Sequence, residues 1–337
     1  MSLTPLVTER FIIPVWEENN RPKVFVAVKR YTPRLQSTRH QPSTGLSLVL
    51  THGVSFHKEL WEPTLTRLFD QQLQPGCAFR IREAWAIDSP NHGESASLNE
   101  RLINSGFLLT YRDFARGVIA FFESGLIDIK RSTIIGIGHS AGSAPLIWAA
   151  NKWYRAFHQS PFSALILLEP PIISMQLDAK YDHFNSMLAA RAKRRRGTWS
   201  SKQEASMWIK KQQQKWDPQC AALFQEFGLR FDNNSVSLSC NGAQEAACYS
   251  VSEQDEVLNI LKVRPLLMIH RNPEIRENIV DRSQGRTMAS IEWMPGVGHF
   301  APIENPGITS YALAHCLASI SRGRPLPSFY IPNSARL

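Results

Sequence analysis

The stretch of sequence that decides the fold is residues 131–143, which read RSTIIGIGHSAGS. Residues 134–137 are a short apolar run rich in β-branched side chains, which is typical of a buried strand. The segment GHSAG (138–142) follows it, and small, helix-compatible residues continue to Ala150. This order predicts a strand, a tight turn and a helix, with Ser140 at the apex of the turn and its hydroxyl clear of the sheet.

A bare G-x-S-x-G pattern is short enough to occur by chance, so the apolar strand before it carries the prediction. After such a strand the pattern is a nucleophile elbow. The turn forces strained backbone angles on the serine, and the two glycines leave room for the helix to pack on the strand. The alternative is a glycine-rich turn with a surface serine. We take Ser140 as the candidate nucleophile.

Composition and charge limit the class of protein. The chain has 337 residues, 43% of them hydrophobic and 20% charged, which suits one large α/β domain with an insertion or two small domains. It contains no apolar run long enough to span a membrane, and its first residues lack the apolar core of a secretion signal. None of its five cysteines shows C-x-x-C spacing, so we expect no zinc site, no disulfide framework, no metal and no other cofactor.

The formal net charge of +9 favours a polyanionic partner such as anionic lipid, nucleic acid or coenzyme A. Much of this charge lies in residues 191–196, RAKRRR. The simplest interpretation is a solvated helix face, and the alternative is that Arg194, Arg195 and Arg196 hold the phosphates of coenzyme A at the mouth of a site. No nucleic-acid-binding motif accompanies the run, so nucleic acid is not expected as a partner.

Hydrophobic periodicity predicts strands that alternate with helices, and therefore an α/β fold with a mostly parallel central sheet and helices on both faces. The strands are expected at residues 11–15, 23–31, 46–50, 79–87, 134–137, 165–168, 265–270 and 290–294, and the main helices at 60–73, 111–124 and 308–320.

About 90 residues separate the strands at 165–168 and 265–270, far more than a simple connection needs. This insertion has helical signals of its own, among them the capping box Ser201-Lys202-Gln203-Glu204. We therefore predict a helical cap at 172–262, inserted between core segments 1–171 and 263–322, with an extended tail at 323–337.

Polar residues follow several of the predicted strands, where functional groups of parallel sheets collect. A serine nucleophile needs a base, and His299, on a glycine-rich loop after the last strand, is the preferred one. The base in turn needs a carboxylate. Glu169 directly follows an apolar strand and is favoured, while Glu274 is the main alternative. Weaker candidates for the acid are Asp178, Asp255 and Asp281.

An oxyanion hole requires two backbone N–H groups near the nucleophile. Ala141, directly after Ser140, and Val54, in the loop after the third strand, are the expected donors. Residues expected to line the substrate pocket are His52, Gly53, His139 and Trp208, although Trp199, Trp208 and Trp216 fit the core of the cap better than a substrate wall. The segment DSPNHGES at 88–95 is expected to form a structural loop beside the site.

These motifs together resemble the α/β-hydrolase superfamily over nearly the whole chain: THG at 51–53, DSPNHGES at 88–95, GHSAG at 138–142 and GVGHF at 296–300. A narrower resemblance links THGVSFHKELWEP, IGIGHSAG and LILLEPPI to fungal peroxisomal hydrolases. That group comprises acyl-CoA hydrolases of mycophenolic acid biosynthesis, hydrolases of host-selective-toxin pathways and a yeast peroxisomal lipase. In the mycophenolate enzyme the acid of the triad stands just after the sixth strand, in an L-L-D-P setting. Leu168-Glu169-Pro170 matches that place with glutamate instead of aspartate, so the resemblance favours Glu169 over Glu274.

The resemblance implies a serine hydrolase that cleaves an acyl-CoA thioester or a carboxylic ester through an acyl-enzyme in fungal secondary metabolism. Other possibilities are an acyltransferase, a cyclase or a lipase on the same scaffold, and a non-catalytic binding protein. The final residues, Ala335-Arg336-Leu337, are similar to the small–basic–Leu peroxisomal address. We therefore expect a peroxisomal import receptor as a partner and a peroxisomal location, with the cytoplasm as the alternative. The sequence leaves a homodimer open.

Overall fold

A computed structural model describes residues 6–33, 45–172, 174–232, 235–249, 266–269, 288–292 and 296–323, together with positions 257, 258, 260, 274, 277, 279, 281, 283 and 294. The predicted C-terminal address at 335–337 lies outside the described residues. Among the helices that are described, none combines the length and apolar character that a bilayer crossing requires.

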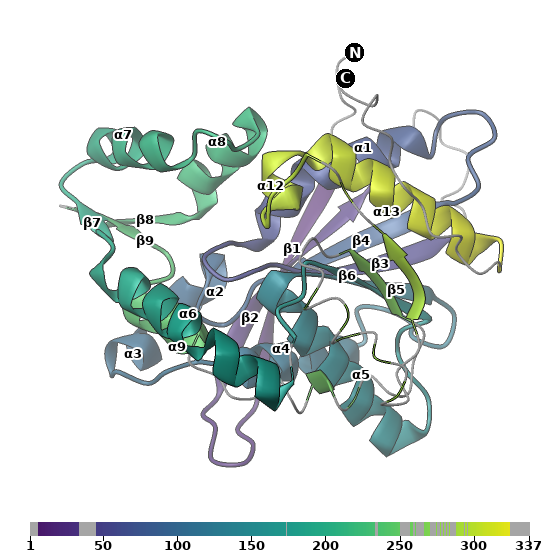
Figure 1. Cartoon of the computed structure of the whole chain (residues 1–337), viewed down its shortest axis with the longest axis horizontal. Coiled ribbons are helices and arrows are strands. Elements are labelled where there is room, and N and C mark those ends of the chain that lie inside the picture. Colours follow the sequence, from purple (N-terminus) through teal and green to yellow (C-terminus); the bar gives the residue numbers. More distant parts are fainter. Residues whose placement is uncertain are drawn as a thin grey trace.

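An eight-stranded sheet forms the centre of the molecule, in the order β1-β2-β4-β3-β5-β6-β10-β11 (Figure 1). Strands β4 to β11 in this order pair in parallel, whereas β2 runs antiparallel to both of its neighbours. The predicted mostly parallel α/β sheet is therefore confirmed. The bounds of its strands are β1 Val7–Val15, β2 Val24–Thr32, β3 Leu46–Thr51, β4 Ile81–Ile87, β5 Thr133–His139, β6 Ala164–Leu168, β10 Leu266–Ile269 and β11 Met288–Glu292.

Helices cover both faces of this sheet because its strands alternate apolar side chains between two cores. On β3, Val49 faces the core beneath α4 and α5, while Leu48 and Leu50 face the core beneath α1 and α13. The helices around the central sheet are η1 Lys58–Trp61, α1 Glu62–Gln71, α2 Gly93–Leu98, α3 Glu100–Asn104, α4 Tyr111–Glu123, α5 Ser143–Phe157, α12 Ala301–Glu304 and α13 Pro306–Ser321.

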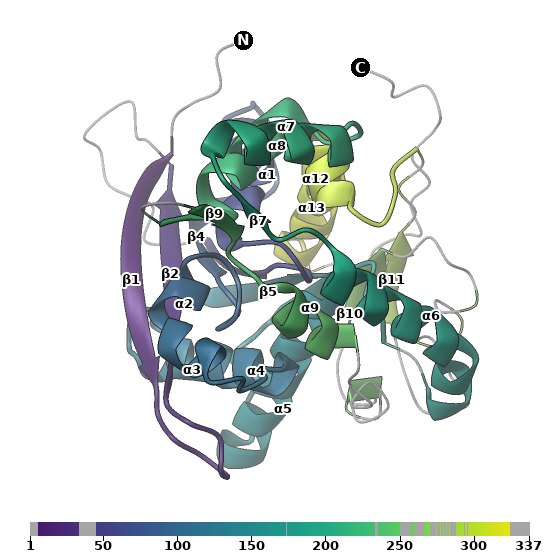
Figure 2. The ribbon, with the colours of Figure 1, turned by 90° about the vertical axis from the view of Figure 1, so that its left-hand side faces the viewer.

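The segment between β6 and β10, which was predicted as a helical cap, is a mixture of helices and strands (Figure 2). Its helices are α6 Met175–Arg194, α7 Lys202–Gln212, α8 Pro218–Phe227 and α9 Gly242–Tyr249. A three-stranded antiparallel sheet joins them, in the order β7 Thr198–Trp199, β9 Ser235–Leu238 and β8 Leu229–Asp232.

The helices of the expected cap are present, together with three short strands that the sequence analysis did not predict. On β9, Val236 and Leu238 alternate with serines and point into a small separate core. Four-residue strands of this kind are too short to stand out in the sequence beside strong helical patterns. We call residues 174–232 and 235–249, which lie between β6 and β10, the cap.

Candidate active site

Ser140 lies at a sharp turn between β5 and α5, where a short 3₁₀ turn, η2 (Ser140–Gly142), connects strand and helix. Its backbone has φ of 51°, in the left-handed region that non-glycine residues rarely adopt. The predicted strand, turn and helix are thus present with the expected backbone strain at the serine. The side chain is 8% exposed, so its hydroxyl meets the rest of the protein rather than open solvent.

The two glycines of the motif are required by close backbone contacts. A Cβ atom on Gly142 would lie 2.4 Å from the carbonyl oxygen of His52, and one on Gly138 would lie 2.7 Å from the Cα of Ser143. Thr51 adds a hydrogen bond from its hydroxyl to the carbonyl of Gly142, at 2.7 Å. The turn is therefore held against the end of β3 by contacts that leave no space for a larger residue.

Three side chains from distant parts of the chain meet at this turn. Ser140 Oγ lies 2.8 Å from His299 Nε2, and His299 Nδ1 lies 3.4 Å from a carboxylate oxygen of Glu169. Glu169 is 4% exposed and follows β6 with φ of 51°, while the His299 side chain is 33% exposed. With a proton on Nδ1, His299 donates to Glu169 and accepts from the serine hydroxyl, which is the arrangement that a serine nucleophile needs.

The competing acids lie elsewhere. Glu274 accepts hydrogen bonds from Lys180 at 2.6 Å and from Tyr181 at 3.1 Å, both on α6. Asp281 accepts from the backbone and hydroxyl of Ser283. Asp255 and the side chain of Asp178 lie outside the described residues. Glu169 is thus the candidate acid that lies against His299.

His139 holds the loop that carries His299. Its Nε2–H donates to the carbonyl oxygen of His299 at 2.8 Å, and its ring stacks on Phe56 with the ring centroids 6.0 Å apart. Burial lowers the pKa of His139 to about 3, so the ring stays neutral at physiological pH. His139, which was expected at the substrate pocket, is buried and supports the backbone of His299, the candidate base.

His52 is a second buried support. Its Nδ1–H donates to the carbonyl of Gly53 at 2.8 Å, and its Nε2 accepts from the backbone N–H of Ser89 at 3.0 Å. Burial lowers its pKa to about 3 as well. Both ring nitrogens are occupied by backbone groups, so His52 fixes the loops after β3 and β4 and does not offer a nitrogen to a substrate.

The predicted donors of the oxyanion hole belong to segments on either side of Ser140. A Cβ atom on Gly53 would lie 3.1 Å from Ser140 Cβ, so the segment that continues to Val54 runs directly beside the serine. Ala141 follows the serine and is buried within η2. Because Gly53 has no side chain, its backbone can lie close to Ser140.

Several side chains hold the loop His52–His57, which we call the β3 loop. Ser55 has φ of 71°, and its N–H donates to Nε2 of the buried His92 at 3.0 Å. Beyond the loop, Asp88 accepts from both the backbone N–H and the ammonium group of Lys58, each at 2.8 Å. Burial by itself would lower the pKa of Lys58, but the carboxylates of Asp88 and Glu59 outweigh it and raise the pKa above its usual value. Sequence reasoning missed the roles of Ser55 and Lys58, which depend on partners about 30 residues or more away along the chain.

Comparison with known proteins identifies the family of this chain. Residues 48–309 match the model of the alpha/beta hydrolase family. The chain belongs to that family. It is 28% identical over 208 residues to the type I acyl-CoA thioesterase mpaH of Penicillium brevicompactum, an alignment that covers 60% of this chain and 43% of the relative. It is 34% identical over 146 residues to the peroxisomal membrane protein LPX1 of Saccharomyces cerevisiae, which covers 43% of this chain and 35% of the relative.

Each of these alignments therefore spans less than half of the curated relative. Among solved structures, the yeast peroxisomal α/β-hydrolase Lpx1 superposes with a TM-score of 0.76 at 20% identity, covering 98% of this chain and 93% of that chain. A thioesterase domain from the curacin biosynthetic pathway gives a TM-score of 0.61 at 13% identity, covering 92% of this chain and 99% of that chain. These superpositions establish the fold of this hydrolase-family member.

Aromatic rings connect the loop of the base to the β3 loop and to the cap. Phe300, next to His299, is 38% exposed and packs edge-on against Phe56, with centroids 5.3 Å apart. Phe56 also contacts Trp216 of the cap, at 5.6 Å. Trp208 packs on Trp199 in the cap core at 5.2 Å, in line with the favoured cap-core interpretation and not with its alternative at the substrate pocket. The cap tryptophan that contacts Phe56 is Trp216.

The three consecutive arginines point in different directions. Arg194 is exposed. Arg195 forms an ion pair with Glu245 of α9, and Arg196 forms one with Glu204 of α7. The alternative interpretation, in which all three arginines hold coenzyme A phosphates, does not fit Arg195, because its side chain is half-buried against the β3 loop.

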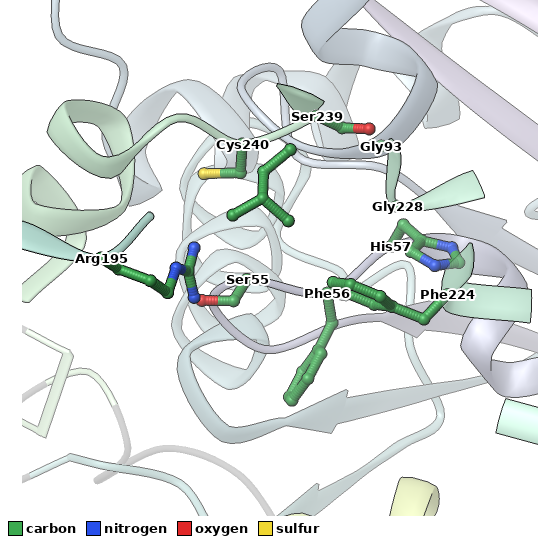
Figure 3. Close-up of a pocket in the computed structure, with 10 residues that line it drawn as sticks. Ser55, Phe56, His57, Gly93, Arg195, Phe224, Gly228, Ser239 and Cys240 are labelled. Atoms are coloured by element: carbon green, nitrogen blue, oxygen red, sulfur yellow. The ribbon is translucent and has the colours of Figure 1, made fainter. Parts of the chain in front are cut away.

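A small cavity lies where Arg195 meets that loop. Its volume is about 10 Å³, which is room for a single water molecule (Figure 3). The cavity is lined by Ser55, Phe56, His57, Gly93, Arg195, Phe224, Gly228, Leu238, Ser239 and Cys240.

Proposed function

We propose that this protein is a serine hydrolase that cleaves acyl thioesters or carboxylic esters through an acyl-enzyme. The observation that carries the proposal is the contact of Ser140 Oγ with His299 Nε2 at 2.8 Å, with Glu169 behind the other ring nitrogen. A hydroxyl, an imidazole and a buried carboxylate in this order form a nucleophile, its base and the group that stabilises the charged base.

In the first half-reaction, Ser140 Oγ attacks the acyl carbonyl while its proton moves to His299 Nε2. Glu169 stabilises the imidazolium that forms, and the N–H groups of Val54 and Ala141 stabilise the negative charge on the carbonyl oxygen. His299 then gives the proton to the departing thiolate or alkoxide. In the second half-reaction, a water molecule loses a proton to His299 and attacks the acyl-enzyme, which releases the carboxylic acid and restores the serine.

For the substrate, we propose an acyl-CoA thioester ahead of a simple ester. The similarity to a type I acyl-CoA thioesterase of Penicillium supports this order. Phe300 and Trp216 offer apolar surface to an acyl chain, and the exposed Arg194 places positive charge on the cap beside Arg196, which is paired with Glu204. A peroxisomal location, reached through the C-terminal Ala335-Arg336-Leu337, is part of the proposal and is supported by the similarity to the yeast peroxisomal protein.

A fluorophosphonate probe and a substrate panel test the reaction. The wild-type protein should be labelled at Ser140 and should hydrolyse acyl-CoA thioesters and short-chain esters, whereas Ser140→Ala should lose both labelling and turnover. If the wild-type protein is folded but is neither labelled nor active on any member of the panel, the proposed hydrolase is wrong.

The thioester preference has a test of its own. Charge reversal at Arg194 and Arg196 should raise KM for acyl-CoA substrates and leave KM for a neutral ester unchanged, because the phosphates of coenzyme A carry the negative charge. Equal changes for both substrates would show that these arginines act on the fold of the cap and not on coenzyme A.

A further inference from the structure

Glu304, the last residue of α12, contacts the loop that carries the candidate base. Its carboxylate accepts a hydrogen bond from the backbone N–H of Gly298 at 2.6 Å. Gly298 directly precedes His299 in the sequence. Because a hydrogen bond to a carboxylate is stronger than one between neutral groups, this contact holds the backbone firmly on one side of the base.

The backbone of Glu304 holds the other side of the base. Its N–H donates to the carbonyl oxygen of Phe300 at 2.8 Å. Gly298 and Phe300 flank His299, so the base lies between two points that are both held by one residue. The carbonyl oxygen of His299 itself accepts from His139 at 2.8 Å. The backbone before, at and after the base is therefore fixed, which limits the positions that the imidazole can reach.

The helix that carries Glu304 is a suitable anchor because it is itself held in place. Ala301 is 0% exposed and Ile303 is 1% exposed. The carbonyl oxygen of Ile303 accepts from the backbone N–H of Asp217 in the cap, at 2.9 Å. Figure 1 shows α12 beside α13 and next to the cap helix α8. Through Glu304, the loop of the base is thus attached to a buried part of the molecule.

Gly298 is matched to this contact. A Cβ atom at this position would lie 2.7 Å and 2.8 Å from the two carboxylate oxygens of Glu304. A larger residue would push the carboxylate away, because the end of a glutamate side chain moves more easily than the backbone. Glycine therefore lets the carboxylate lie directly against the N–H group.

We propose that Glu304 is a positioning residue for His299. By holding Gly298 and Phe300, it keeps Nε2 of His299 within hydrogen-bond distance of Ser140 Oγ, where the proton is transferred. It acts through the base and not on the substrate. This inference rests on the proposed hydrolase function. The expected signature is a loss of kcat, because a catalytic group displaced by about 1 Å can lose on the order of 100-fold in rate.

Asn305 provides a matched control, because it is the next residue and holds a different part of the chain. Its side chain accepts from the backbone N–H of Ile308 at 2.9 Å and so caps α13. Asn305→Ala should lower the midpoint of thermal unfolding and leave kcat unchanged. If Glu304 served only the stability of α12 and α13, Glu304→Ala would have the same kind of effect as Asn305→Ala.

The experiment measures kcat and KM for a neutral chromogenic ester, and the rate of fluorophosphonate labelling of Ser140, in variants that thermal melts show to be folded. Glu304→Ala should lower kcat and the labelling rate together, roughly 10- to 100-fold, with KM within about threefold of wild type. Glu304→Gln should recover most of this loss, because the amide oxygen can still accept from the N–H of Gly298.

Gly298→Ala tests the same contact from the other side. Its methyl group should displace the Glu304 carboxylate and lower kcat, whereas Glu304→Ala removes the atoms that the methyl group would meet. The double variant should therefore be no slower than Glu304→Ala alone, since two changes in one contact are not additive.

Three outcomes would overturn the inference: a wild-type kcat in Glu304→Ala, an equal loss of kcat in Asn305→Ala, or fully additive effects in the double variant. Failure of the underlying function is distinguishable from these. An inactive wild-type protein would overturn the hydrolase proposal together with this inference, whereas an active wild type with an unaffected Glu304→Ala variant would overturn this inference alone.

Discussion

Removal of the charge on Glu169 is the sharpest test of the candidate triad. In the transition state His299 becomes an imidazolium, 3.4 Å from the Glu169 carboxylate. Two unit charges at that separation attract by about 5 kcal/mol at an effective dielectric constant of ~20. Since the His299 side chain is 33% exposed, solvent screening reduces the useful part to about 3–4 kcal/mol, which corresponds to roughly a 10²- to 10³-fold change in rate.

Glu169→Gln should therefore lower kcat by that factor, with little change in KM, because the amide keeps the shape of the side chain and loses its charge. The assay is steady-state hydrolysis of a chromogenic ester, together with the rate of fluorophosphonate labelling of Ser140. Glu274→Gln is the matched control and should behave like wild type, since Glu274 pairs with Lys180 and Tyr181. A folded Glu169→Gln protein with kcat within about threefold of wild type would refute the assignment of Glu169 as the acid.

Three further outcomes are expected. Burial lowers the pKa of His52 and His139 to about 3, whereas the unfolded chain takes up these protons near pH 6.5. The free energy of unfolding, measured in urea, should thus stay level above pH 6.5 and fall below that pH by about 1.4 kcal/mol per pH unit for each histidine. The slope should be shallower in His→Gln variants. A flat profile between pH 6.5 and 5 would contradict the burial of both histidines as neutral rings. Gly142→Ala should destabilise the protein by roughly 3 kcal/mol or more and abolish labelling, because the new Cβ would lie 2.4 Å from a backbone oxygen, while Gly197→Ala, with open space around it, should not change the midpoint of thermal unfolding. Phe300→Ala should raise KM for long-chain acyl substrates and leave acetyl esters unaffected; an equal rise for both would exclude a role in acyl binding.

The elbow around Ser140 was predictable because everything it needs is local. An apolar strand, a left-handed turn and a helix succeed one another within residues 133–157, and Gly138 meets backbone atoms that the turn itself brings close. Gly142 is an exception, because its close neighbours are the backbone atoms of Thr51 and His52 at the end of β3. The mostly parallel sheet followed from the same local alternation of strands and helices. For the acid, Glu169 was favoured by its place at the end of a strand, although Glu274 remained open until the structure paired it with α6.

The histidines and tryptophans behaved differently. Both His52 and His139 stand beside motif residues and were expected at a substrate pocket. In the structure His52 bonds to the carbonyl of its neighbour Gly53 and to the distant N–H of Ser89, and His139 bonds to the carbonyl of His299. Likewise, Trp208 lies on α7 and Trp216 in the turn that follows it, and it is the packing of the cap that places Trp216 against Phe56. Nothing in the local sequence specifies such partners.

The sequence by itself determined the order of strands and helices, the strained serine turn and the strand ends at which reactive groups gather, because backbone propensity and hydrophobic period act over a few neighbouring residues. Tertiary structure alone decided which buried nitrogen holds which carbonyl, which arginine of three turns inward to Glu245, and where short strands form within the cap. Those choices depend on burial and on hydrogen-bond partners that are distant along the chain, and they become physical constraints once the distant segments have packed.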